Sequence, residues 1–185
     1  MTSETNTAAR VEAALGGSID AGALSVDHDG MVCIRATPEE LHAVCTALKV
    51  RAGFESNTLI TARDHGLDAK CGRFELFYQF LSYEFGDRVR VRVMTTGDAP
   101  EVDTITDLWP GTAFSERECW DLLGVRFRGH ANLRRLLMPE GFDHHPLRKD
   151  FPHIGIEPDR LYRQWDDARR SAFASEEAET EKGAH

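Results

Sequence analysis

The stretch Arg88–Met94, with the sequence RVRVRVM, decides the fold class more clearly than any other part of the chain. Valine and arginine alternate along it, and successive side chains of a β-strand point to opposite faces of the sheet. The valines are therefore predicted on a buried face and the arginines on a solvated face, as in a half-buried antiparallel strand. The sequence predicts a sheet with one face in water.

Segments on either side supply more strands. Asn57–Ala62 and Arg73–Tyr83 are rich in β-branched and aromatic residues and are bounded by glycines. Upstream, Ala23–Val26 and Met31–Ile34 flank the polar turn Asp27–Gly30, which predicts a tight hairpin. We expect these segments to form one antiparallel or mixed sheet.

A helix is predicted between the hairpin and the later strands. Thr37–Glu40 combines a capping residue, a proline suited to the first helical turn and a glutamate placed for a capping box. Gly53 is a plausible end. The apolar residues in between share one helical face: Leu41, Val44, Cys45 and Leu48. The fold class is therefore α+β, with helices on one face of the sheet.

The remaining chain is predicted to be less regular. Residues 1–20 form a flexible amino-terminal segment with one short helix at Val11–Leu15, and residues 21–97 form the α+β domain. After Met94 we expect no further strands. Residues 98–174 form an extended partner-docking segment with a helical turn near Asp103–Trp109 and a helix that begins at Pro158, and residues 175–185 form a disordered tail.

The composition limits which classes of function are possible. The formal net charge of −9 opposes binding to nucleic acid or to an anionic membrane. No apolar stretch has the roughly 18 to 20 residues that a membrane-spanning helix needs, and the first residues lack the apolar core of a signal peptide. Cys33, Cys45, Cys71 and Cys119 are widely spaced, so we expect reduced core thiols in a cytoplasmic protein rather than a metal site.

The charged stretch Ser115–Gly124 allows two interpretations. In the structural one, Ser115 and Glu118 form a capping box, Arg117 pairs with Asp121 one turn later, and Gly124 ends the helix. In the catalytic one, Glu118 and Asp121 share a helix face and work with His130 in acid–base or metal chemistry. The second interpretation lacks a nucleophile and a clear further ligand, and the structural one is favoured.

Other candidate sites are weaker. His130, His144, His145 and His153 do not have the spacing of helical metal-binding pairs. The arginines of Arg88–Met94 could follow a phosphate backbone, but a solvated strand face has the same pattern and the acidic net charge favours it. No dinucleotide-binding, P-loop or nucleophile-elbow motif is present. A compact domain with a long charged extension is typical of an assembly subunit.

A spaced series of charged and apolar residues supports this interpretation. It contains Glu-Arg-Glu, an acid and an aliphatic pair, then a histidine, a basic residue and a second aliphatic pair: Glu116, Arg117, Glu118, Asp121, Leu122, Leu123, His130, Arg134, Leu136 and Leu137. Thr106–Pro110 precedes the series and Pro146–Pro152 closes it. Over about residues 57–165 the chain resembles the C subunit, of the 30-kilodalton subunit family, of proton-pumping NADH:quinone oxidoreductase, respiratory complex I.

Some positions depart from the commonest family form. Cys119-Trp120 and Leu122-Leu123 stand where that form has an aromatic residue before the acid and a Met-Phe type pair after it, and His144 replaces a glycine. Relatives of this subunit also serve membrane-bound hydrogenases and quinone oxidoreductases with other electron donors, so an equivalent subunit of such a complex is the alternative.

The resemblance implies a scaffold without catalytic residues, cofactor or metal of its own. FMN, iron–sulfur clusters, NADH and quinone would belong to other subunits. The chain would hold the quinone-site D subunit, lie beside the B subunit and other peripheral-arm subunits, and reach the cytoplasmic side of the membrane only through the complex. The implied partner-binding residues are Glu116, Arg117, Glu118, Asp121, Gly124, His130, Arg134, Arg135, Pro146, Leu147, Arg148, Lys149 and Asp150.

Overall fold

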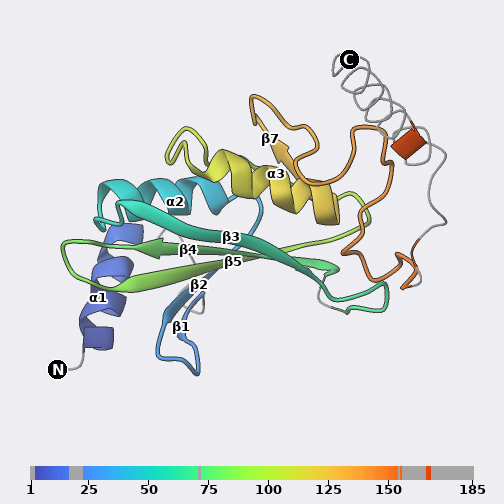
Figure 1. Cartoon of the computed structure of the whole chain (residues 1–185). Helices are drawn as coiled ribbons and strands as arrows, with labels where there is room; N and C mark the ends of the chain where they lie inside the picture. Colours follow the sequence, from blue (N-terminus) through green and yellow to red (C-terminus); the bar gives the residue numbers. More distant parts are fainter. Residues whose placement is uncertain (1–2, 17–22, 71, 154, 156–165, 168–185) are drawn as a thin grey trace, which may run out of the picture. The chain divides into compact units, whose positions relative to one another are not determined.

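The computed structural model of the chain describes residues 3–16, 23–70, 72–153, 155 and 166–167 (Figure 1). Two compact units divide the chain, Met1–Phe151 and Pro152–His185. The first unit contains, in order, α1 (Ser3–Leu15), β1 (Leu24–Val26), β2 (Val32–Ala36), α2 (Leu41–Val50), β3 (Ser56–Asp64), β4 (Phe74–Leu81), β5 (Arg88–Thr95), β6 (Glu101–Asp103), α3 (Thr112–Leu123) and β7 (Arg126–Arg128).

A five-stranded mixed sheet with the order β1-β2-β5-β4-β3 forms the centre of this unit. β2 pairs with β5 in parallel, and the other neighbouring strands pair antiparallel. The alternating stretch Arg88–Met94 lies in β5, the central strand. The predicted hairpin of β1 and β2 and the three later strands are confirmed, with bounds shifted by a few residues.

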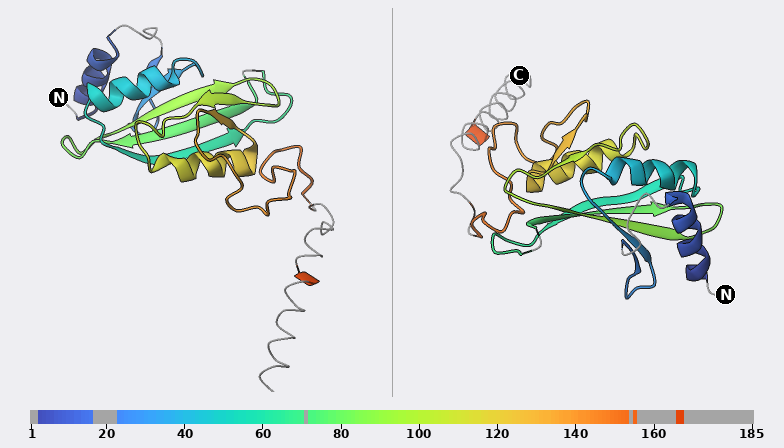
Figure 2. Two further views of the ribbon diagram at one scale, coloured as in Figure 1. Left: turned by 90° about the horizontal axis from the view of Figure 1, so that it is seen from above. Right: turned by 180° about the vertical axis from the view of Figure 1, so that it is seen from behind.

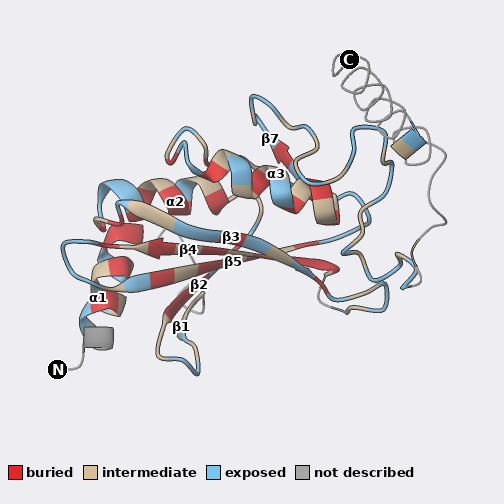
Figure 3. Cartoon of the chain, in the orientation of Figure 1, coloured by how far each residue is buried: buried red, intermediate tan, exposed pale blue. Residues whose placement is uncertain are grey.

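Helices α2 and α3 cover one face of the sheet (Figures 1 and 2). On that face Val89, Val91 and Val93 are fully buried, because they pack in one core with side chains of β4 and the helices. The predicted apolar stripe of α2 belongs to the same core, and Figure 3 shows the buried residues along β4 and on the inner sides of the helices. The predicted α+β class is confirmed.

The beginning of α2 follows the predicted chemistry. The Thr37 hydroxyl accepts a hydrogen bond from the Glu40 N–H at 3.3 Å, and the Glu40 carboxylate accepts one from the Thr37 N–H at 2.9 Å. This reciprocal capping box forms the turn before Leu41, where the helix begins. The chain leaves the helix after Val50 and turns at Gly53, whose φ of +69° suits glycine.

The amino-terminal prediction needs correction. Helix α1 begins at Ser3, not near Val11. It is held by tertiary contacts that a propensity argument misses, since Val11 is fully buried and the Arg10 guanidinium bonds both carboxylate oxygens of Asp87. Arg10 also lies over the Phe85 ring, with 3.9 Å from its guanidinium carbon to the ring centroid.

The expectation that strands stop after Met94 is wrong. Strands β6 and β7 pair in parallel, with Val102 opposite Phe127 and both side chains buried. Each strand spans three residues, too few for an alternating pattern to be visible in the sequence. The predicted helical turn that follows is confirmed, because the N–H groups of Leu108 and Trp109 both donate to Ile105 O.

The predicted boundary between residues 97 and 98 lies inside the first compact unit. Helix α3 packs on β3, so part of the predicted docking segment completes the core. The predicted carboxy-terminal helix from Pro158 and the predicted tail lie mostly outside the described residues; Asp166 and Asp167 are helical.

Candidate functional site

The site implied by the sequence begins at helix α3. The helix starts at Thr112, earlier than the predicted start at Ser115, because Gly111 is its N-cap and the Thr112 hydroxyl donates to Trp109 O at 2.8 Å. Ser115 and Glu118 therefore lie within the helix, and the predicted capping box is wrong. The predicted end is confirmed: Gly124 has a φ of +77°, and its N–H donates to Trp120 O at 2.8 Å.

Glu116 points into the core of the unit. Its carboxylate is fully buried and accepts hydrogen bonds from the Ile105 N–H at 2.9 Å and the Thr104 hydroxyl at 2.5 Å. Burial raises the pKa of Glu116 to about 7, although these two donors act in the opposite direction. Glu116 thus fastens α3 to the segment after β6 and is not available to a partner chain.

Asp121 is the second inward carboxylate. One oxygen accepts from the Arg135 guanidinium at 2.8 Å. The other accepts from three consecutive backbone N–H groups, those of Leu136, Leu137 and Met138, at 3.0, 2.6 and 3.0 Å. Burial alone would raise the pKa of Asp121, but these donors outweigh it and hold the pKa below its ordinary value. The side chain organises the loop that contains the second aliphatic pair.

Arginines complete this anchoring. Arg135 also donates to Asp121 O at 2.8 Å and to Phe142 O, and its guanidinium lies over the Trp120 ring, 5.1 Å from the centroid. Arg117 does not pair with Asp121 as predicted. It donates instead to the carbonyls of Arg134 at 3.2 Å and Arg135 at 2.8 Å, because Asp121 is already occupied on the inner side of the helix.

The closing motif packs against the end of α3. The Leu147 N–H donates to Leu122 O at 3.0 Å, and Arg148 donates to Leu123 O at 2.7 Å, so both bonds use carbonyls that a helix leaves unpaired at its end. The Arg148 guanidinium also lies 5.2 Å from the centroid of the Phe74 ring. A side chain at position 124 would clash with Arg148 and the His145 ring. This is a second reason for glycine at this position, besides its positive φ.

An ion-pair network around the buried pair Arg73 and Asp64, which the sequence did not reveal, joins the closing motif to the sheet. Arg73 contacts Asp64 at 3.3 Å, Asp150 at 2.9 Å and also Asp98. The Lys149 N–H donates to Asp64 at 2.8 Å. Burial alone would raise the pKa of Asp64, but these donors outweigh burial and hold the pKa below its ordinary value. Asp64 and Arg73 carry no local sequence signal, since their partners are distant along the chain.

The catalytic interpretation finds no support in the geometry. Both oxygens of Asp121 are engaged as described, and His130 contacts Ala113 O at 3.1 Å and the Asn132 N–H at 3.1 Å. Glu118 is exposed. Within the part of the chain that the structure describes, no group of three or more histidine, cysteine, aspartate or glutamate residues is placed to hold a metal ion.

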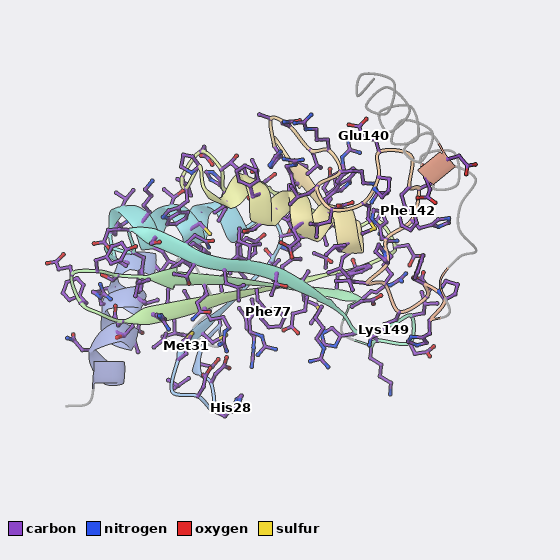
Figure 4. All side chains as sticks on the ribbon, viewed as in Figure 1. His28, Met31, Phe77, Glu140, Phe142 and Lys149 are labelled. Atoms are coloured by element: carbon purple, nitrogen blue, oxygen red, sulfur yellow. The ribbon has the colours of Figure 1, made fainter. Side chains whose placement is uncertain are left out.

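Other residues of the same region face outward and form what we call the docking surface. Phe114, Leu137 and Leu147 are 64, 59 and 57% exposed, although all are large and apolar. Leu147 borders a cavity of about 470 Å³ whose lining also includes Leu123 and Lys149. Figure 4 shows the Glu140, Phe142 and Lys149 side chains on this carboxy-terminal part of the unit. The remaining exposed candidates are Glu118, Arg134, Lys149 and Asp150.

Most candidate residues thus separate into two groups, and Arg117, His130 and Pro146, which are partly exposed, belong to neither. The inward group fixes the backbone within the chain: Glu116, Asp121, Gly124, Arg135 and Arg148. The outward group is exposed, and Asp150 in it also pairs with Arg73 at 2.9 Å. Contacts of either group with a partner remain a prediction. The inward group finds its hydrogen-bond partners inside the chain.

Comparison with known proteins gives consistent results. Residues 34–157 match the family described as the 30 kDa subunit of respiratory-chain NADH dehydrogenase. The C subunit of NADH-quinone oxidoreductase from Azorhizobium caulinodans is 37% identical over 149 residues, which cover 80% of this chain and 69% of that protein. The C subunit from Moorella thermoacetica is 42% identical over 113 residues, covering 61% and 74%.

Two solved structures share the fold. A trypsin-resistant fragment of Nqo5 superposes with a TM-score of 0.58 at 29% identity and covers 67% of this chain and 99% of the fragment. A chain of the membrane-bound sulfane sulfur reductase, an archaeal respiratory membrane complex, gives a TM-score of 0.64 at 25% identity and covers 78% and 84%. None of the helices in the described residues is long and apolar enough to cross a membrane.

Proposed function

The chain belongs to the family of the 30 kDa subunit of respiratory-chain NADH dehydrogenase, and from this premise we propose that it is the C subunit of an NADH:quinone oxidoreductase of the complex I type. It acts as a non-catalytic scaffold in the peripheral arm and holds the quinone-site D subunit and the B subunit in place. FMN, iron–sulfur clusters, NADH and quinone are bound by other subunits. The chain is peripheral, on the cytoplasmic side, and meets the membrane only through the complex.

The division between inward and outward residues carries this proposal. The inward carboxylates and arginines fix the loop and closing motif before any partner binds, so association does not have to order them. Preorganisation of this kind lowers the entropic cost of binding. The outward group then presents Phe114, Leu137 and Leu147, which are large, apolar and more than half exposed, for contact with a partner.

Substitution of the docking surface tests the proposal. In a tagged full-length chain, Leu137→Glu combined with Leu147→Glu should lower the fraction that migrates with the complex on a native gel by roughly tenfold or more, since burying charge at a hot spot costs about 2 kcal/mol or more. Turnover per assembled complex should stay unchanged. Val50→Glu is the matched control, because Val50 is 73% exposed and lies on α2.

Measurements on the isolated variant and on the assembled complex separate loss of docking from misfolding and from loss of catalysis. The isolated double variant should melt at the same temperature as the unsubstituted chain, because both side chains are more than half exposed. Full co-migration of the double variant would contradict the docking role. Full assembly with lost turnover would contradict the scaffold role and require a direct part in the reaction.

A second candidate function is supported by the similarity to the sulfane sulfur reductase chain. The protein would then be the equivalent subunit of a membrane-bound hydrogenase or of a quinone oxidoreductase with another electron donor. Mass spectrometry of the gently solubilised complex decides between the two functions, because the co-migrating input subunits identify the donor. Recovery of the chain as a free monomer would contradict both and make metal analysis the next step.

A further inference from the structure

The sheet has a second face that none of the helices in the described chain covers over β3, β4 and most of β5 (Figures 1 and 2). We call it the open face. Figure 4 shows Phe77 on this side, away from α2 and α3. The strand register places alternate residues of these strands on it, among them Arg35, Leu59, Arg63, Phe77, Leu81 and Arg88.

Three apolar side chains lie among polar ones on the open face, with Leu59 opposite Gln79 and between Phe77 and Leu81 in register. Leu59 is 44% exposed, and Phe77 and Leu81 are partly exposed on the neighbouring strand. The exposed part of these apolar side chains would be removed from water by a partner that binds this face. Together with the backbone of three paired strands, they provide a partly apolar surface.

Some arginines of the open face are already paired. Arg90 contacts Asp27 at 2.6 Å and Asp29 at 3.0 Å in the β1–β2 turn. Arg92 donates to Glu75 at 2.7 Å, and its guanidinium lies 5.5 Å from the centroid of the Phe77 ring. These contacts fix the middle of the face and neutralise its acidic residues.

The other arginines of the face are available. Arg35, Arg63 and Arg88 are exposed and form no ion pair with another described residue. They lie on β2, β3 and β5, around the strand that contains Phe77 and Leu81. The open face therefore carries uncompensated positive charge, although the whole chain has a formal net charge of −9. This local reversal of sign is the charge complement of a negatively charged partner.

We propose that the open face docks an acidic protein surface, with carboxylates beside an apolar side chain, on another subunit of the same complex. The inference rests on the assembly role proposed above but concerns a surface other than the docking surface. Arginine with aromatic and aliphatic neighbours is typical of protein interfaces, and the guanidinium fork matches a carboxylate. The acidic net charge of the chain opposes approach to an anionic membrane.

Photo-cross-linking in the native complex tests this surface. A photoreactive amino acid replaces Thr61, which is exposed on β3 opposite Phe77 of β4, in the tagged full-length chain. The expected product joins position 61 to an Asp- and Glu-rich peptide of one other subunit. Arg63→Glu combined with Arg88→Glu should lower its yield at least about fivefold. Arg126→Glu is the control, since the Arg126 side chain is 75% exposed on β7, away from this face.

Each alternative result has one meaning. Two results would overturn this inference and leave the scaffold role intact. One is normal co-migration without a cross-link from position 61. The other is a cross-link whose yield the double charge reversal does not lower. A lipid adduct, or sedimentation with phosphatidylglycerol vesicles that the double reversal abolishes, shows a membrane occupant and overturns the protein one. Failure of the unsubstituted tagged chain to co-migrate overturns the assembly role together with this inference. Equal melting temperatures of the variants exclude misfolding.

Discussion

At the scale of single residues, carboxylates that look alike in the sequence have opposite properties in the structure. Glu116 and Asp121 both lie on the inner side of α3, but Glu116 has few donors and a raised pKa, whereas Asp121 has one guanidinium and three N–H groups and a lowered pKa. The exposed Glu118 on the same helix takes part in neither arrangement. The number of donors that each buried carboxylate finds decides its protonation.

Glu116 should make stability depend on pH near neutrality. Its pKa rises from 4.5 to about 7 on folding, so the native state keeps a proton that the unfolded state loses in this range. Its contribution is complete below about pH 4.5 and is lost as pH rises through 7. Glu116→Gln removes this dependence. We expect the variant to gain on the order of 2 kcal/mol relative to the unsubstituted chain between pH 5 and pH 8.

Urea unfolding of both chains across this range measures the effect. The difference between the two free energies of unfolding is the relevant quantity, because other titrating groups contribute equally to both chains. A difference that stays constant with pH would show that Glu116 does not change protonation there.

At the scale of elements, the end of α3 depends on one glycine that serves two purposes. Gly124 adopts a left-handed conformation that ends the helix, and its missing side chain leaves room for His145 and Arg148. The closing motif then occupies the helix carbonyls Leu122 O and Leu123 O. Helix termination and motif docking are therefore coupled through the backbone geometry of one position.

Gly124→Ala should loosen the closing motif. The left-handed conformation costs about 1 kcal/mol for alanine, and the methyl group would lie 2.7 Å from the His145 ring. We expect a lower melting temperature and faster proteolytic cleavage near residues 145–151. Gly111→Ala is the control, since Gly111 has a φ of −63° and nothing within 4 Å of the added methyl group. Equal cleavage rates in the two variants would contradict this coupling.

At the scale of the whole unit, an ion-pair network around the buried Arg73 connects parts that are distant in sequence. Arg73 begins the β4 region, Asp64 ends β3, Asp98 follows β5 and Asp150 belongs to the closing motif. The Arg73 side chain is 6% exposed and the Asp64 side chain 1%. Removal of one partner of such a pair strongly destabilises the fold, because the remaining charge stays buried without a partner.

Arg73→Gln should therefore cost about 3 to 5 kcal/mol in the free energy of unfolding. Amide hydrogen exchange at Lys149 should accelerate, since its N–H bonds to Asp64. Addition of Asp64→Asn should recover part of the loss. Arg128→Gln is the control, because Arg128 and Asp103 form an exposed pair at 2.8 Å that is worth less than about 1 kcal/mol. Unchanged protection at Lys149 would show that the network does not hold the closing motif.

Local sequence patterns determined the fold class and much of the sheet. The alternation in Arg88–Met94, the apolar stripe of α2 with its capping box, and the glycine that ends α3 were all predicted and confirmed. Each depends on residues within one or two turns or along one strand, so their spacing records which side is buried. The spaced charged motif likewise indicated the family that the comparison shows.

Only the tertiary structure decided which charges face inward. Glu116 and Asp121 belong to the scaffold rather than to a partner contact, Arg117 bonds to carbonyls rather than to Asp121, and Asp64 with Arg73 anchors the closing motif. The pairing of β6 with β7 and the early start of α1 also depend on contacts between distant segments. Tertiary contacts between distant segments determine which residue pairs with a buried charge, and spacing along the sequence does not contain that information.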